Sequence, residues 1–288
     1  MKLQKPQYEI WMQNPGEQGI YQQIERAGRV CYKSENNTTK DSARPFVERM
    51  IQSEHFAMLE HGTVYLTCNH GELPPYLTNK FSHYNTIDGK DYITTNLRVL
   101  AENKAMDDLK FLDDYQEGKH DIRITVHFTT QIAITREYNR HRANSMAEQS
   151  TRYCNYTKNK FGNEITINIP TWIGDNVEEN NSEKFLELCE DIANSETDDW
   201  TTIDSWYFAN QAAEFAYMKL IEAGCKPQEA RVILPLDCNT ELVHTAFIND
   251  WKHFFDLRAL GTTGAPHPDA KILAEPLMEE FLAKGYLK

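Results

Sequence analysis

Arginines gather between residues 130 and 158 of this 288-residue chain, whose formal net charge is −13. Arg136, Arg140, Arg142 and Arg152 lie there with His141, among carboxylate, amide and hydroxyl side chains. Arginine offers planar, two-point recognition of phosphate. A concentration of arginine in an acidic chain therefore indicates a local site for an anion.

The apolar residues at the start of this segment predict the helix that positions the arginines. Ile132, Ile134 and Tyr138 fit one helical face that runs out near Arg140. Arg136 and Arg140, four residues apart, then share a face that can hold a diphosphate or two separate phosphates. The alternative is a solvated helix face with surface ion pairs. The hydroxyls and the carboxylate that follow favour the anion site.

Arg140-His141-Arg142, followed after seven residues by Ser150, resembles the signature of the flavin-dependent thymidylate synthase family. The flanking positions that agree are Glu148, Arg152 and Tyr153. Other segments that resemble the family are residues 29–32, 55–61, 229–236, 253–258 and 267–270. The resemblance extends over roughly residues 8–286, apart from two insertions.

The resemblance implies an α+β fold, with a mostly antiparallel central sheet flanked by helices in a single catalytic domain over residues 1–288. It also implies a homotetramer whose flavin sites are shared between subunits. Compact members pass from Glu60-His61 and one strand almost directly to the arginine helix, so residues 69–120 form an extension. Strand-like patterning continues through it, and whether it is a subunit contact or a lid stays open.

The activity implied by the resemblance is reductive methylation of dUMP to dTMP, with methylenetetrahydrofolate as carbon donor and NADPH-reduced FAD as hydride source. No enzyme nucleophile is obligatory in this route. Arg258 would be the catalytic residue, because an arginine facing the pyrimidine edge stabilises an ionised ring. The implied dUMP-binding residues are Glu137, Tyr138, Asn139, Arg140, Glu148, Gln149, Ser150, Thr151, Arg152, Arg231 and Arg258. The implied FAD-binding residues are Ala57, Arg140, His141, Arg142, Glu148, Phe247, Asn249 and His253.

Several of these positions depart from the family pattern. Glu137 stands where compact members often have Gln, and we expect it to pair with Arg136. Phe247 and Asn249 stand where Asn and Arg are common, and Ala57 replaces a hydroxyl residue. No Gly-x-Gly-x-x-Gly fingerprint is present, so NADPH is expected to share the folate or nucleotide site.

Two other functions compete with the synthase. A non-catalytic nucleotide-binding protein would use the same arginines without turnover. A metal hydrolase would use His55, Glu60 and His61, but the four residues between the first two differ from inverted zinc-peptidase spacing, and we expect no metal. Cys154, the thiol nearest the arginines, is expected to be structural.

Composition excludes several further classes. A pI near 5.2 argues against a duplex nucleic-acid binder. No apolar run reaches the length of a membrane span, and residues 1–11 lack the apolar stretch of a signal peptide. The six cysteines have no paired or metal-finger spacing, which predicts reduced thiols in a cytoplasmic protein.

Hydrophobic periodicity and cap signals predict the remaining elements. Strands are expected at residues 8–12, 63–68, 92–99, 122–128, 164–169 and 239–247. Helices are expected at residues 17–29, from Asp41 (a possible N-cap) or Ser42 to residue 53, around 185–192 and at 202–223. Two more are expected after residue 247, one capped by Asn249 or Asp250 and running to Arg258, and a last one that ends at about residue 284.

Overall fold

The computed structural model describes residues 1–72, 75–174, 177 and 181–287. Part of the polar segment after residue 175 in the sequence lies outside these ranges. The strands are β1 (Lys2–Gln4), β2 (Gln7–Trp11), β3 (Thr63–Asn69), β4 (His83–Ile87), β5 (Lys90–Asn96), β6 (Arg123–Gln131), β7 (Ser145–Glu148), β8 (Thr166–Asn168) and β9 (Asn239–Phe247). The α-helices are α1 (Gly16–Val30), α2 (Ala43–Gln52), α3 (Leu97–Glu102), α4 (Ile132–Tyr138), α5 (Ser182–Asn194), α6 (Thr202–Glu222), α7 (Pro227–Ala230), α8 (Ile248–Arg258) and α9 (Pro268–Ala283). Short 3-10 turns include η2 (Phe56–His61), η4 (Met106–Phe111) and η6 (Arg231–Ile233).

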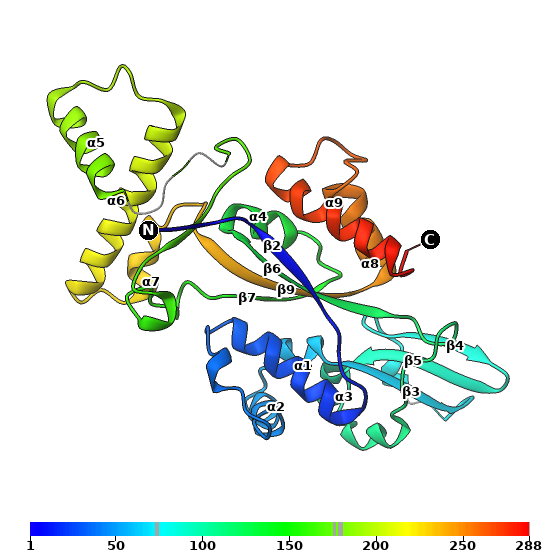
Figure 1. Cartoon of the computed structure of the whole chain (residues 1–288). Coiled ribbons are helices and arrows are strands. Elements are labelled where there is room, and N and C mark those ends of the chain that lie inside the picture. Colours follow the sequence, from blue (N-terminus) through cyan, green and yellow to red (C-terminus); the bar gives the residue numbers. More distant parts are fainter. Residues whose placement is uncertain (73–74, 175–176, 178–180, 288) are drawn as a thin grey trace.

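A four-stranded antiparallel sheet in the order β2-β6-β9-β7 lies at the centre, with α8 and α9 on one face and α1 on the other (Figure 1). Alternation along the strands produces these layers. Val126 and Phe128 of β6 pack against α8 and α9, whereas Val243 of β9 packs toward α1. Trp251 fixes α8 to the sheet by donating from its indole N–H to the Ile124 carbonyl at 3.0 Å. The expected α+β class with antiparallel pairing is confirmed.

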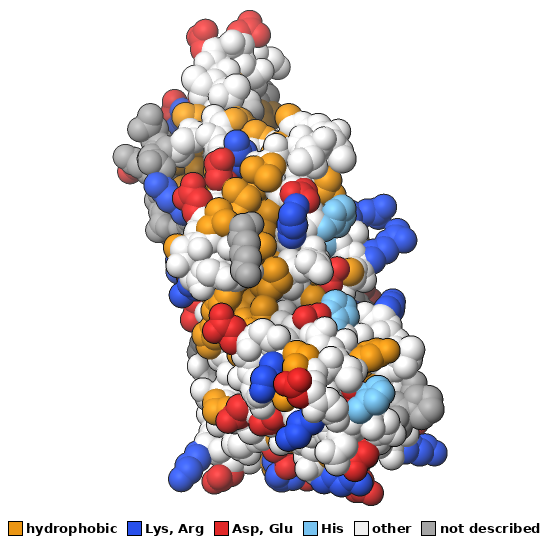
Figure 2. All heavy atoms as spheres, turned by 90° about the vertical axis from the view of Figure 1, so that its right-hand side faces the viewer, with side chains coloured by type: hydrophobic (Ala, Val, Ile, Leu, Met, Phe, Trp, Pro, Cys, Tyr) orange, Lys and Arg blue, Asp and Glu red, His pale blue; other side chains and the backbone are white. Residues whose placement is uncertain are grey.

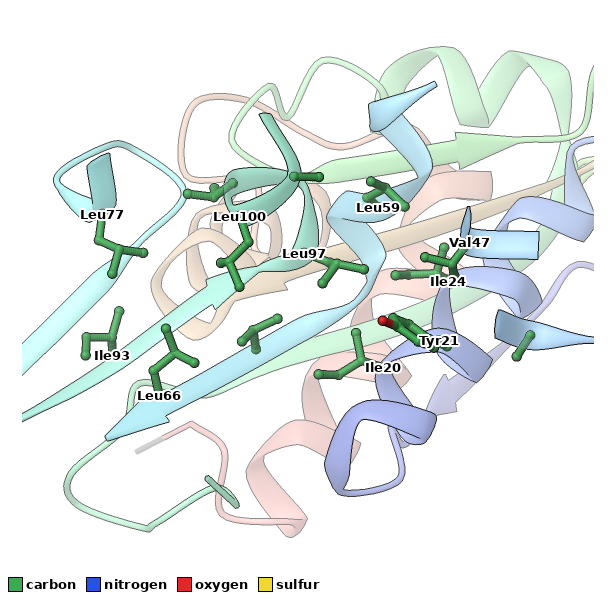
Figure 3. Packing of buried hydrophobic residues seen from close by; sticks show 14 of the residues in the cluster. Ile20, Tyr21, Ile24, Val47, Leu59, Leu66, Leu77, Ile93, Leu97 and Leu100 are labelled. Atoms are coloured by element: carbon green, nitrogen blue, oxygen red, sulfur yellow. The ribbon is translucent and has the colours of Figure 1, made fainter. Parts of the chain in front are cut away.

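Strands β4 and β5 of the extension join β3, which precedes it, in a second antiparallel sheet of order β3-β5-β4, and α3 and η4 follow. Figure 3 shows Leu66 and Ile93 of this sheet, and Leu97 and Leu100 of α3, in the same core as Ile24 of α1. Residues 69–120 therefore share a hydrophobic core with the N-terminal helices and are not a separate unit joined by a linker.

At the opposite end of the molecule, α5 and α6 form a helical hairpin beside the parallel pair of β1 and β8 (Figure 1). No helix in the described ranges is long and apolar enough to cross a membrane. On the face that carries α8 and α9, hydrophobic side chains gather in a band bordered by charged residues (Figure 2). Exposed large apolar side chains on or next to these helices are Leu260, Ile272 and Leu282.

Several predicted boundaries are wrong for identifiable reasons. The α2 N-cap is Ser42 rather than Asp41, and the Ser42 hydroxyl donates to Glu25 instead of capping the helix. The strand expected at residues 92–99 ends at Asn96, whose side chain accepts from the Val99 N–H at 3.2 Å and starts α3. The N-cap of α8 is Phe247, because β9 runs directly into the helix and leaves Asn249 and Asp250 in its first turn. The strand 239–247 is confirmed.

Candidate anion and nucleotide site

The signature, Arg140 to Ser150, begins in the turn after α4 and ends just beyond β7, a strand that was not predicted from the sequence. Helix α4 stops at Tyr138, and a turn leads into β7, where Glu148 is paired with Leu242 of β9. The next two backbone N–H groups are also anchored, since Gln149 donates to the Glu241 carbonyl at 2.8 Å and Ser150 to the Cys31 carbonyl at 2.9 Å. Ser150 is thus held between β9 and the loop after α1.

Three arginines of the signature segment have unpaired guanidiniums. Arg136, Arg140 and Arg142 are exposed, and within the described ranges their side chains make no hydrogen bond or ion pair. Arg136 lies on α4, but Arg140 lies in the turn beyond it, so the two do not share one helical face as predicted. Such free cations attract a phosphate-bearing ligand.

Arg152 and Arg231 form a second group of cations, although their segments lie about eighty residues apart in the sequence. The Arg231 guanidinium, on η6, approaches the Thr151 hydroxyl at 3.4 Å. The Arg152 Nε–H donates to the Gln228 side chain at 3.1 Å, and the Arg152 backbone N–H to the Ser150 hydroxyl at 3.3 Å. We call Ser150, Thr151, Arg152 and Arg231 the hydroxyl–arginine cluster. It presents two guanidiniums and two hydroxyls on the surface, which is the donor set that a phosphate requires.

The carboxylate of the signature, Glu148, has neutral donors within the chain. Its two oxygens accept from the Thr135 hydroxyl at 2.6 Å and from the Asn139 amide at 2.7 Å. Gln149 and Tyr138 are buried, and the Tyr138 hydroxyl donates to the Ala270 carbonyl at 2.8 Å. The side chains of Asn139 and Tyr138 therefore brace α4 against β7 and α9.

Arg258, at the end of α8, is bound to the end of α4. Its guanidinium donates to the Glu137 carboxylate at 2.7 Å, to the Glu137 carbonyl at 2.9 Å and to His141 Nε2 at 3.2 Å. The expected pairing of Glu137 with Arg136 is therefore wrong, because α8 brings a different arginine against this carboxylate. Burial, Arg258 and His253 lower the pKa of His141 to about 4, which matches its role as acceptor.

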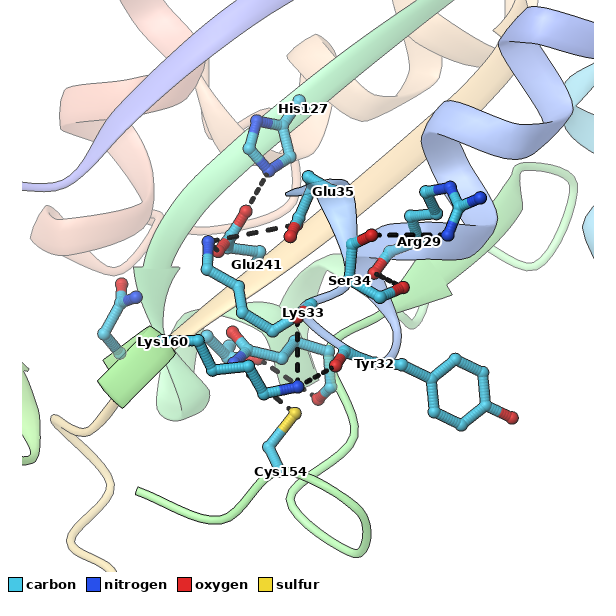
Figure 4. A network of polar contacts seen from close by, with 12 residues as sticks. Arg29, Tyr32, Lys33, Ser34, Glu35, His127, Cys154, Lys160 and Glu241 are labelled. Atoms are coloured by element: carbon cyan, nitrogen blue, oxygen red, sulfur yellow. Dashed lines mark hydrogen bonds and ion pairs between the residues drawn. The ribbon is translucent and has the colours of Figure 1, made fainter. Parts of the chain in front are cut away.

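A buried acid that no sequence pattern indicated lies next to the signature, on β9. Glu241 of β9 pairs with Lys33 and with His127, whose Nε2 lies 2.9 Å from its carboxylate (Figure 4). Burial opposes ionisation of Glu241, but the bond from His127 and the Lys33 ammonium lower its pKa. Lys160 donates to the carbonyls of Tyr32 and Lys33, so this network holds the loop that anchors Ser150.

Ala57 and Phe247, both expected at the flavin, line different pockets among the described residues. Ala57 lines a cavity of about 490 Å³ with Cys31, Tyr32 and His55. Phe247 and Asn249 line another cavity, of about 670 Å³. The Phe247 ring is buried against His83 of β4, with ring centroids 3.7 Å apart, while His253 lies beside His141 at 5.7 Å.

The groups considered for a metal or a nucleophile are engaged elsewhere. Glu60 pairs with Arg98, and His61 is buried with its Nδ1 2.9 Å from the Thr245 hydroxyl. Among the described residues no group of three or more His, Cys, Asp or Glu side chains is placed to hold a metal ion. Burial raises the pKa of Cys154, which disfavours the thiolate that a nucleophile requires.

The fold and the two groups of guanidiniums define an α+β protein with a candidate site for a phosphate-bearing ligand. The chain belongs to the flavin-dependent thymidylate synthase family, since residues 117–284, more than half of its length, match the family described as thymidylate synthase complementing protein.

No curated protein matches the sequence. Among solved structures the chain is similar to the UMP/dUMP methylase PolB from Streptomyces cacaoi, bound with 5-Br dUMP or 5-Br UMP. The identity is 17%, the alignments cover 99% of this chain and 93% or 92% of PolB, and the TM-scores are 0.43 and 0.44. The likeness is distant, and the ligands are those of PolB.

Proposed function

We propose that this protein is a flavin-dependent thymidylate synthase that methylates dUMP reductively to dTMP. Methylenetetrahydrofolate would donate the carbon, NADPH would reduce the FAD, and no enzyme nucleophile would be obligatory. The observation that carries the proposal is the hydroxyl–arginine cluster, in which Arg231 meets Thr151 beside Ser150 and Arg152. Membership of the family supports the same activity.

In this proposal the nucleotide phosphate lies on the hydroxyl–arginine cluster and on Arg140. Two guanidiniums match the charge of a phosphate dianion, and the hydroxyls of Ser150 and Thr151 supply neutral donors. Glu148, held by Thr135 and Asn139, is a fixed acceptor for a nucleotide or flavin N–H. Arg258 faces the pyrimidine edge, where its charge stabilises the ionised ring. Tyr138 and Gln149 are buried beneath the site and support the segments that carry its exposed residues.

Several observations fit an FAD-binding role. The unpaired guanidiniums of Arg140 and Arg142 suit a pyrophosphate, and the cavity beside Ala57 offers an apolar wall through Phe46, Met50 and Phe56. His141 and His253 would lie against the ring system. Bound FAD supplies the hydride for the reduction; the residues of this chain bind it, orient it and exclude water.

A homotetramer explains how separated residues serve one flavin. Ala57 and Phe247 line different cavities of one chain, and in a tetramer residues from several copies would complete each site. The band of apolar side chains on the α8 and α9 face suits a subunit contact (Figure 2). We further propose one catalytic domain over residues 1–288, no separate NADPH domain and a cytoplasmic location, which the six free cysteines support.

An anaerobic assay tests the proposal. The protein is given dUMP tritiated at C5, methylenetetrahydrofolate and NADPH, with and without FAD, and UMP is offered in parallel as an alternative nucleotide. We expect flavin absorption in the purified protein and FAD-dependent tritium release from dUMP. Nucleotide binding without tritium release, under all conditions, would instead identify a non-catalytic binding protein.

Two variants locate the site in that assay. Ser150→Ala and Arg258→Ala should abolish tritium release and leave FAD bound, because neither is assigned to the flavin. Lys219→Met, on the exposed face of α6 where Lys219 pairs with Glu222, is the matched control and should keep activity. Unchanged turnover in the first two variants would remove both residues from the site.

A further inference from the structure

The guanidinium of Arg258 is fixed by one residue through both its side chain and its backbone. One terminal nitrogen donates to the Glu137 carboxylate at 2.7 Å and the other to the Glu137 carbonyl at 2.9 Å. The Arg258 Nε–H donates to His141 Nε2 at 3.2 Å. These three acceptors use every nitrogen of the guanidinium, so its plane and its position are determined within the chain.

The base of this contact is rigid. Arg258 is the last residue of α8 and Glu137 lies in the last turn of α4, whose carbonyls carry the negative end of the helix dipole. Beneath them the rings of Tyr138 and Phe254 meet at 4.8 Å. The two helix ends are thus joined above a packed aromatic core.

The charge of Arg258 is balanced by Glu137 alone. In the described ranges Glu137 makes no other ion pair, and Arg258 makes no other. Their side chains are 32% and 17% exposed, so solvent screens the pair only in part. The other titratable or charged groups near it are His141 and His253, buried Tyr138, and the free guanidiniums of Arg136 and Arg140.

We propose that Glu137 is a positioning residue for Arg258, and that its charge sets how readily a bound pyrimidine ring ionises. The inference rests on the proposed function, in which Arg258 faces the ring. Glu137 holds the guanidinium in one orientation and offsets part of its positive potential. A ring beside this pair therefore ionises less easily than a ring beside a lone arginine would.

The test measures ring ionisation directly. Oxidised, FAD-bound protein is mixed with 5-fluoro-dUMP, whose fluorine reports the charge of the ring, and 19F NMR follows the signal between about pH 6 and 10. Glu137→Gln should lower the midpoint of the bound ligand by about one pH unit, because a negative charge near the ring is removed. Glu222→Gln removes one charge from the exposed end of α6 and should leave the midpoint unchanged.

A second variant separates position from charge. Glu137→Asp keeps the carboxylate but is one methylene shorter, so the midpoint should stay near that of the wild type while kcat for tritium release falls about tenfold. This variant also serves if Glu137→Gln does not fold, as judged by circular dichroism.

The outcomes are distinguishable. If wild-type protein binds 5-fluoro-dUMP but Glu137→Gln shows the wild-type midpoint, or Glu137→Asp the wild-type kcat, Glu137 does not have this role and the proposed function stands. If the wild type binds no pyrimidine nucleotide, the proposed function fails and this inference fails with it.

Discussion

Three histidines buried without charge should make the fold sensitive to mild acid. His61 and His244 are fully buried, and burial lowers the pKa of each to about 3, with nearby Arg123 adding to the effect on His61. His141 is also buried, and its pKa is lowered to about 4 by burial, Arg258 and His253. Below the ordinary pKa of histidine, about 6.5, the unfolded chain takes up protons at these positions and the folded chain does not.

The magnitude follows from linkage. Each such histidine makes the free energy of unfolding fall by about 1.4 kcal/mol per pH unit as the pH decreases. These three contribute a slope of about 4 kcal/mol per unit between roughly pH 6 and 5, above the range in which most carboxylates titrate. Buried His120, whose pKa is also lowered by burial, adds to the slope in the same direction. The stability is fully present above pH 6.5 and is lost as the pH falls toward the folded pKa values.

Urea unfolding at fixed protein concentration, repeated at half-unit steps from pH 7.5 to 5, measures this slope. His61→Gln can retain a bond to Thr245 and should reduce the slope by about 1.4 kcal/mol per pH unit, whatever it does to the absolute stability. His55→Gln is the control and should keep the wild-type slope, because the His55 side chain is exposed and makes no hydrogen bond or ion pair with the described residues. A His61→Gln slope equal to that of the wild type would refute the reasoning.

Three further predictions concern the site and the core. Arg231→Met should raise the Kd for dUMP about tenfold with an unchanged circular dichroism spectrum, because a charged donor beside Thr151 is lost; titration calorimetry with dUMP measures it, and an unchanged Kd would contradict the assignment. Cys154→Ala should keep tritium release within about twofold of the wild type, since the thiol is buried and protonated; loss of turnover with the fold intact would make it catalytic. Gly28→Ala should destabilise the fold by about 1–3 kcal/mol in urea, because its Cβ would lie 2.7 Å from the Phe46 ring; an unshifted midpoint would contradict the packing.

The elements predicted correctly are those with capping interactions between neighbouring residues or with a hydrophobic pattern that extends over many residues. The helix expected at residues 202–223 has a Thr201 and Asp204 capping box and ends before Gly224, whose φ is +97°. Strand β9 was predicted to the residue, because Thr240, Val243, Thr245 and Phe247 are of types that favour a strand. Strand β7 was missed, since its four residues are too few for a period and its partner lies about a hundred residues away in β9.

Some residues of the candidate site could be predicted from the sequence, and some of the contacts between them could not. The resemblance to the family was sufficient to point to Ser150, Arg152 and Arg231, which the structure places together. The partner of Glu137 could not be predicted, because it depends on the packing of α8 against α4. The sequence also could not predict the network of Lys33, Glu241 and His127, because its members come from three separate segments and match no motif.

The stacking of His83 on Phe247 has a consequence for how the extension relates to the rest of the molecule. Strands β4 and β5 form a β-hairpin that carries His83, Phe247 is the N-cap of α8, and Arg258 is its last residue. The β-hairpin therefore contacts one end of a helix about 16 Å long whose other end carries the guanidinium. A shift of the β-hairpin would therefore move α8 as a rigid helix and displace Arg258 at its other end. Deleting residues 69–120 would therefore not yield a smaller version of the same protein. The deletion would remove His83, expose the Phe247 ring and leave the first turn of α8 without this contact.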